Sequence, residues 1–175
     1  LSTRAKPLGI ELQLSQSESF EIDENVFGLF LQLPGRSGIF WDPAALIASA
    51  HQAGVLVIAA VDPLAQVLMT PVGHLGVDCA GGIAPSFGVP MGYGGPHAAF
   101  FATRDAHKRS IPGRIIGVSK DSQARSALRL ALQPRENTSR RATTTSNLRQ
   151  PTVPLATLPH TYARFPGPSG PTPTP

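Results

Sequence analysis

The feature that most constrains the fold is a pair of apolar runs separated by one short helical segment. The first run covers residues 26–33 (VFGLFLQL) and the second covers residues 55–61 (VLVIAAV), and both have the aliphatic character of buried parallel strands. Between them, Asp42 can cap a helix that has Pro43 at its first position and Gly54 as its stop. Such short connections predict a right-handed strand-helix-strand crossover, and therefore an α/β fold with a mainly parallel sheet and flanking helices.

Further elements are expected on both sides of this unit. The alternation of Ile10, Leu12 and Leu14 predicts a half-buried strand over residues 8–14. Polar residues 15–25 and the Pro-Gly turn at residues 34–38 are typical of connections. Short strands are predicted at residues 76–80, 98–102, 115–118 and 128–132, with a helical turn at residues 105–109.

Proline is concentrated after residue 150. An interior proline removes a backbone donor and costs a helix about 3 kcal/mol, so Pro151, Pro154 and Pro159 together predict that no helix forms there. Beyond Pro166 the composition is that of a linker. We therefore expect residues 1–149 to form part of one domain and residues 150–175 to form a disordered tail.

Charge and cysteine content exclude several classes of protein. The net charge of +4 comes mostly from arginine, and we interpret the late arginines as a solvated face rather than as a site for an anionic ligand. No aromatic residues interleave with them, and no zinc-finger or RNA-recognition signature is present. We therefore predict no nucleic-acid partner. No apolar run approaches the roughly 20 residues of a membrane span. Cys79 is the single cysteine, which excludes an internal disulfide and suits a reducing compartment.

Asp62 is the first candidate for a binding role. It follows the second apolar run directly, and open α/β sheets bind their ligands at the carboxyl ends of the strands. The alternative is that Asp62 simply caps a helix over residues 64–69. The residue pattern alone leaves both interpretations open.

The glycine-rich segment at residues 92–97 (GYGGPH) is the second candidate. Such a loop can present N–H groups to a phosphate or pass close to a flat cofactor, but it matches neither the P-loop nor the dinucleotide fingerprint. A tight hairpin connection is the favoured alternative. His97 could face a carboxylate or phosphate, or be an ordinary hydrogen-bonded loop residue. Because the histidines lack ligand spacing, no metal site is predicted.

The same region carries a resemblance to a known family. One long segment is nearly identical in sequence to the corresponding segment of the P-protein of the glycine cleavage system, which it therefore resembles closely. It covers residues 87–110 (FGVPMGYGGPHAAFFATRDAHKRS) and continues with PGR at 112–114. Shorter matching pieces run along the chain at residues 3–5, 8–11, 50–54, 130–133, 135–136 and 145–147. The resemblance thus covers most of this chain, but only a modest part of the full P-protein, within its amino-terminal half.

The resemblance implies part of the large domain of a fold type I pyridoxal-phosphate enzyme. Its family is glycine dehydrogenase (decarboxylating), an oxidoreductase that acts on glycine and transfers the aminomethyl group to the lipoyl H-protein. The family has two homologous halves, and the lysine that binds pyridoxal phosphate lies in the second. The implied partners are therefore that lysine-bearing half or subunit and the H-protein, in the bacterial cytoplasm or the mitochondrial matrix.

The resemblance also implies site residues. Asp62 matches the aspartate that faces the ring nitrogen of the cofactor, and the glycine loop and a later Thr-Ser-Asn triplet complete the expected set. The expected cofactor-binding residues are Asp62, Gly92, Gly94, Gly95, His97, Thr145, Ser146 and Asn147. Pro85 stands at the position of the family's lysine, and Ser86 replaces an arginine, so we expect no catalytic residue in this chain and no activity of the chain alone. The alternative is a non-catalytic scaffold remnant of the same fold.

Overall fold

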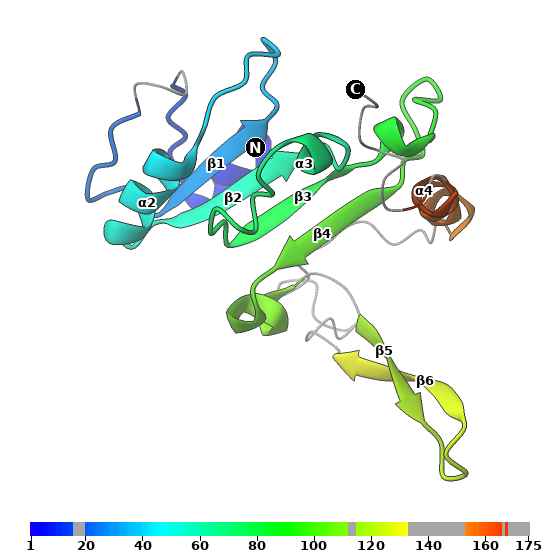
Figure 1. Ribbon diagram of the computed structural model, residues 1–175. Coiled ribbons are helices and arrows are strands. Elements are labelled where there is room, and N and C mark those ends of the chain that lie inside the picture. Colours follow the sequence, from blue (N-terminus) through cyan, green and yellow to red (C-terminus); the bar gives the residue numbers. More distant parts are fainter. Residues whose placement is uncertain (16–19, 112–114, 133–152, 166, 168–175) are drawn as a thin grey trace.

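The computed structural model describes residues 1–15, 20–111, 115–132, 153–165 and 167. Its centre is a four-stranded sheet in the order β1-β2-β3-β4, with parallel pairing from β1 to β3 and antiparallel pairing between β3 and β4 (Figure 1). The strands are β1 (Gly28–Leu33), β2 (Leu56–Val61), β3 (Cys79–Ile83) and β4 (Ala99–Thr103). The prediction of a mainly parallel α/β sheet is confirmed.

Local signals determine the helix between the first two strands, α2 (Ala44–Gln52). At its start, Oδ1 of Asp42 accepts a hydrogen bond from the N–H of Ala44 at 2.9 Å. At its end, Gly54 has a φ of +74°, and the N–H of Val55 donates to the carbonyl of Ala50 at 2.8 Å. This is the left-handed glycine stop that the sequence predicts, because glycine reaches this conformation without a steric penalty.

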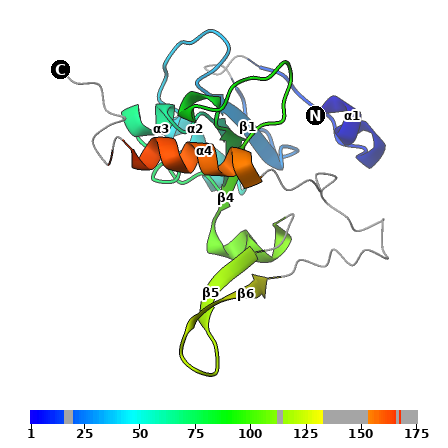
Figure 2. The ribbon, with the colours of Figure 1, turned by 90° about the vertical axis from the view of Figure 1, so that its right-hand side faces the viewer.

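The core lies on one face of the sheet. Figures 1 and 2 show α2 and the short helix α3 (Ala65–Leu68) on that same face. Alternate side chains of β1 and β2 point into it and pack with residues of α2 and the following loops. The buried members of this core include Leu29, Leu31, Leu33, Ile47, Ala50, Val57, Ala59, Val61, Val72 and Val77. Because the strand period is two, the intervening residues such as Phe30 and Ile58 point to the other face, where they are exposed.

The strand predicted over residues 8–14 is wrong. The chain begins with the short helices α1 (Ser2–Ala5) and η1 (Lys6–Leu8), and residues 10–15 are irregular. Gly9 turns the backbone with a φ of +69°, and the side chain of Leu14 is 97% exposed. Alternation of apolar residues is not sufficient for a strand, because a strand also needs a partner for its backbone groups.

The remaining short elements are of the predicted type, but their first or last residues differ from the predicted ones. β3 begins at Cys79 rather than at residue 76, because Gly76 has a φ of +96° and belongs to the preceding turn. The expected helical turn is the 3₁₀ helix η4 (Asp105–Ser110). The last two expected strands are longer than predicted and form an antiparallel hairpin of β5 (Ile115–Lys120) and β6 (Ser126–Leu132).

The expectation that residues 150–175 lack secondary structure is also wrong, because α4 (Val153–Arg164) forms within them. Pro154 falls in the first turn, where a backbone N–H has no intrahelical partner to lose. Pro159 alone interrupts the helix interior. Contacts with the domain offset this cost: Leu155 packs beside Ala84, Val89 and Ala98, and Tyr162 contributes a ring contact described below. Pro151 and residues 168–175 lie outside the described residues, and the domain boundary at residue 150 stays a prediction.

Within the described part of the chain, no helix has the length and apolar character needed to cross a membrane.

Candidate functional site

The candidate site lies at what we call the carboxyl edge, where β1, β2 and β3 end and antiparallel β4 begins. The connection between β3 and β4 passes over this edge and contains the 3₁₀ helix η3 (Pro85–Phe87) followed by the glycine loop. The first and last residues of this connection lie side by side, because the N–H of Ala84 donates to the carbonyl of Ala98 at 3.0 Å. The glycine loop is therefore part of a connection between two antiparallel strands, as the hairpin interpretation predicted, but this connection is long rather than tight.

Asp62 stands at this edge directly after β2 and is partly buried. Its Oδ1 accepts hydrogen bonds from the N–H groups of Leu64 at 2.8 Å and Ala65 at 3.1 Å, so it caps the start of α3. The Ser86 hydroxyl donates to the same carboxylate, at 2.8 Å from Oδ2 and 3.0 Å from Oδ1. The structure thus brings Asp62 to η3, and three donors within the chain already use its carboxylate.

The glycine loop folds back on itself. Gly92, Tyr93, Gly94 and Gly95 all have positive φ values, of 52°, 55°, 109° and 121°. The N–H groups of Gly94 and Gly95 both donate to the carbonyl of Met91 at 3.1 Å. Two of the donors that could have cradled a phosphate are therefore used inside the loop.

His97 closes the loop and packs against it: a Cβ atom added to Gly95 would lie 3.5 Å from the His97 ring. Its Nδ1 is buried and has no hydrogen-bond partner among the described residues. Buried polar atoms are normally paired, so this nitrogen is open to a further ligand or water.

A helix covers one side of this region. The ring of Tyr162 from α4 stacks on Phe87 of η3, with ring centroids 5.5 Å apart and planes inclined by 27°. Gly88, which follows η3 in a left-handed conformation, lies close to the same ring: a Cβ atom added to it would be 3.6 Å from the Tyr162 ring. The other predicted site residues, Thr145, Ser146 and Asn147, lie outside the described residues.

Each of the three lysines belongs to an element outside the connection between β3 and β4. Pro85, at the position that the resemblance assigns to a lysine, opens η3. Lys108 belongs to η4, which follows the far end of β4, and pairs with Asp105 at 2.7 Å. Lys120 ends β5 in the projecting hairpin.

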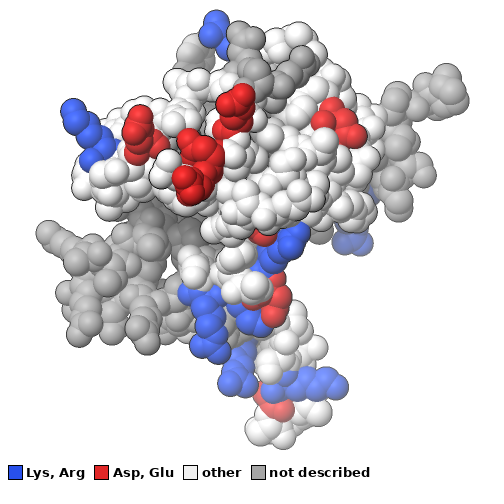
Figure 3. Space-filling view, turned by 90° about the vertical axis from the view of Figure 1, so that its left-hand side faces the viewer, with Lys and Arg blue, Asp and Glu red and all other residues white. Residues whose placement is uncertain are grey.

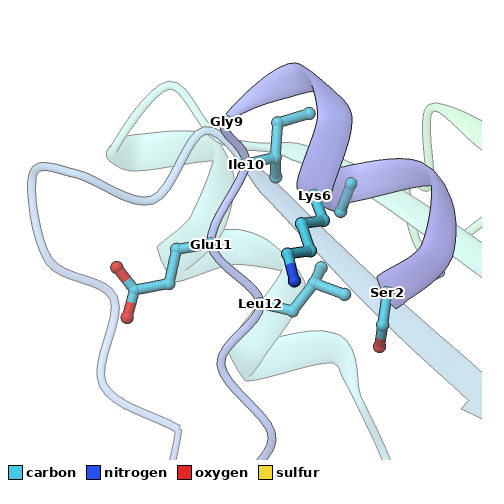
Figure 4. A pocket seen from close by; sticks show the side chains of 7 residues that line it. Ser2, Lys6, Gly9, Ile10, Glu11 and Leu12 are labelled. Atoms are coloured by element: carbon cyan, nitrogen blue, oxygen red, sulfur yellow. The ribbon is translucent and has the colours of Figure 1, made fainter.

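Lys6 lines a separate cavity of about 330 Å³ beside α1 (Figure 4). In that view Lys6 extends toward Leu12 while Glu11 points away from it. The cavity contains none of the predicted site residues.

One buried charged group was not predicted from the sequence as part of any site. Asp78 lies at the opposite, amino edge of the sheet and is only 7% exposed. Its Oδ2 accepts the N–H of buried Val57 at 2.9 Å and lies 3.1 Å from Nε2 of His51, and its Oδ1 lies 3.6 Å from Nε of Arg104. The Thr103 hydroxyl donates to the backbone carbonyl of Asp78 at 2.8 Å.

Burial alone would raise the pKa of Asp78, but the Val57 hydrogen bond, His51 and Arg104 together hold that pKa below its ordinary value of 3.8. This cluster ties α2 to the starts of β2 and β3 and to the end of β4. Its only sequence signal is a carboxylate inside an otherwise apolar segment, GVDCA. In the part of the chain that the structure describes, no group of three or more His, Cys, Asp or Glu side chains could hold a metal ion.

Comparison with known proteins places these features in a family. The family model for the glycine cleavage system P-protein matches residues 1–173. A glycine dehydrogenase (decarboxylating) from a Synechococcus species is 56% identical over 170 residues, which cover 97% of this chain and 18% of that protein. The corresponding protein of a Nostoc species is 49% identical, with 97% and 17% covered. The chain thus spans less than a fifth of the length of these relatives.

The fold agrees as well. The crystal structure of a glycine decarboxylase (P-protein) of the glycine cleavage system, in inhibitor-bound form, superposes with a TM-score of 0.85 at 34% identity. The match covers 95% of this chain and 39% of that one. The predicted fold class, part of a fold type I large domain, is thereby confirmed. On the extent of the family match and on these identities, the chain belongs to the glycine cleavage system P-protein family.

Proposed function

We propose that the chain is a partial subunit of glycine dehydrogenase (decarboxylating) and works only together with the longer P-protein sequence that its relatives contain. The observation that carries the proposal is the 56% identity to a glycine dehydrogenase over nearly the whole chain, on a fold shared with a solved P-protein. In the complete protein the reaction would decarboxylate glycine and transfer its aminomethyl group to the lipoyl H-protein. The expected location is the bacterial cytoplasm, or the mitochondrial matrix in a eukaryote.

The described residues fit a non-covalent contact with pyridoxal phosphate better than covalent attachment. A carboxylate oxygen accepts more than one hydrogen bond, so Oδ2 of Asp62 keeps capacity beside the Ser86 hydroxyl. Nδ1 of His97 is buried and unused. When bound, the cofactor supplies a ring that accepts the electrons released as carbon dioxide leaves. Asp62 would hold a proton at the ring nitrogen, and a lysine outside this chain would supply the covalent link.

A second candidate, a non-catalytic remnant of the fold, is supported by the Ser86–Asp62 hydrogen bond and by Pro85. Both features reduce what this edge can offer to a cofactor. The two proposals differ in what the chain does when the rest of the protein is present.

The discriminating experiment uses a longer protein in which this chain replaces the matching 170 residues of the Synechococcus relative. We expect this chimera to exchange labelled carbon dioxide into glycine, and we expect Asp62→Asn to reduce the exchange rate while the melting temperature stays close to that of the parent. Asparagine caps helices as well as aspartate does, so the fold is preserved. Asp42→Asn, at the other capped helix, is the matched control and should leave exchange unchanged. An inactive but folded chimera would favour the remnant.

The same proposal predicts how the chain alone behaves with pyridoxal phosphate. Since Pro85 has no amine and no lysine belongs to the connection between β3 and β4, borohydride reduction should leave no adduct concentrated at one lysine. Peptide mass spectrometry of the reduced sample measures this. A stoichiometric adduct at Lys6, Lys108 or Lys120 alone would contradict the proposal.

A further inference from the structure

The β5–β6 hairpin has one apolar face that nothing described in the chain covers. Directly opposed residues of an antiparallel pair share a face, and the register pairs Ile116 with Leu130 and Val118 with Leu128. All four side chains are exposed, with Val118 at 83% and Leu128 at 78%. Along the pairs nearer the turn, the opposite face is formed by small and polar residues, namely Gly117, Ser119, Ala127 and Arg129, and Ile115 lies at its far end. The hairpin is therefore amphipathic, but its apolar side faces outward.

Such a hairpin needs a covering surface. A two-stranded ribbon is at best marginally stable by itself in water, and a third layer or strand normally supplies the missing burial. Figures 1 and 2 show the ribbon projecting away from the four-stranded sheet, so the core of this domain does not provide that layer. We propose that the apolar face of the hairpin is a docking surface for a part of the longer P-protein that lies outside this chain. This rests on the proposed function, in which the chain works within such a protein.

The length of the relatives and the charge of the hairpin identify this occupant. The chain covers 18% of the Synechococcus relative, so most of that polypeptide is available to supply a surface. Between residues 115 and 132 the hairpin carries the cations Lys120, Arg125 and Arg129 against the single carboxylate of Asp121. Lys120 pairs with Ser126 and so lies at the end of the apolar face itself.

Figure 3 shows lysine and arginine gathered over this projecting end of the molecule with a few acidic side chains among them, while larger acidic patches lie over the sheet-bearing part, where basic side chains are also present. Two copies of the hairpin docked face to face would bring like charges together, which disfavours a second copy as the occupant. The fitting surface is an apolar strip bordered by carboxylates.

Thiol labelling tests the docking directly. In a Cys79→Ser background, Val118→Cys places a thiol on the apolar face, and Gln123→Cys places a matched control thiol on the exposed turn of the same hairpin. Alkylation at each position is measured by peptide mass spectrometry in the isolated chain and in the Synechococcus chimera. If docking covers the face for about nine-tenths of the time, the thiol can be alkylated only during the remaining tenth. The alkylation rate at position 118 should therefore be about tenfold lower in the chimera than in the isolated chain. Cys at 123 should react equally in both. Leu128→Cys repeats the test if Val118→Cys misfolds.

The outcomes separate this inference from the proposed function. If the thiol at position 118 is protected from alkylation in a chimera that shows no carbon dioxide exchange, the docking surface is supported and the enzymatic role is contradicted. An active chimera with equal labelling at 118 in both proteins would overturn the docking surface. Concentration-dependent protection in the isolated chain would also overturn it, because the occupant would then be a second copy. Lys120→Glu should restore labelling at 118 in the chimera, whereas Arg36→Glu, an exposed charge reversal in the turn after β1, should not.

Discussion

The buried carboxylate of Asp78 gives the sharpest prediction about stability. Asp78→Ala removes the acceptor of the Val57 N–H, which lies in the core and would be left without a partner. Such an orphaned buried donor costs about 1–3 kcal/mol, and the lost hydrogen bond with His51 adds about 1 kcal/mol. Arg104 is half exposed and lies 3.6 Å away, so its loss adds little. We expect the substitution to lower the free energy of unfolding by about 3 kcal/mol, which for a chain of this size corresponds to roughly 6–12 °C in melting temperature.

Thermal unfolding followed by circular dichroism measures this effect in the chain or in the chimera. Asp105→Ala is the matched control, because its side chain is 87% exposed and its ion pair with Lys108 is worth about 0–1 kcal/mol. A loss of stability for Asp78→Ala no larger than that of the control would mean that the cluster at the amino edge contributes no net stability, contrary to this prediction.

The lowered pKa of Asp78 adds a pH dependence with a definite sign. A carboxylate whose folded pKa lies below its unfolded value stabilises the fold above the unfolded pKa, and this contribution is lost as pH falls through the folded pKa. The stability difference between the parent and Asp78→Asn should therefore be full at neutral pH and shrink below the ordinary value of 3.8. A difference that stays constant through the acid range would contradict this assignment.

Two further substitutions test the packing of the carboxyl edge. A Cβ atom on Gly82 would lie 2.0 Å from the Val61 carbonyl oxygen, so Gly82→Ala should lower the free energy of unfolding by at least about 2 kcal/mol in a denaturant titration. Gly73→Ala is the control, because a Cβ atom at that position meets nothing within 4 Å. Equal unfolding midpoints for the two variants would contradict the predicted clash. Tyr162→Ala removes the ring stacked on Phe87, and limited proteolysis should then cut within α4 sooner than in the parent; unchanged cutting would mean that α4 is held by other contacts.

The sequence predicted best those elements whose causes are local. The helix between the first two strands starts at an aspartate and stops at a glycine, and both signals act within a few residues of where they stand. The parallel pairing of the strands on either side follows from that short connection. The strand expected at residues 8–14 failed because alternation says nothing about whether a neighbouring strand exists.

The rest depended on contacts between distant residues. Asp78 finds its partners 21 and 27 residues earlier in the chain, and Asp62 meets Ser86 24 residues later, so neither link could be found from spacing. Of the two interpretations of Asp62, the cap of α3 is confirmed, and its role in binding stays a prediction. In the tail, counting prolines ignored both their place in the helix and the burial offered by Leu155 and Tyr162.

We propose that this chain contributes a partial P-protein domain to glycine decarboxylation and that it cannot perform the reaction alone. Exchange of labelled carbon dioxide into glycine, measured with pyridoxal phosphate and lipoyl H-protein, tests it most directly. We expect no exchange by the isolated chain and clear exchange by the chimera in which the chain replaces the matching segment of the Synechococcus relative. Exchange by the isolated chain, or a folded chimera without exchange, would contradict it.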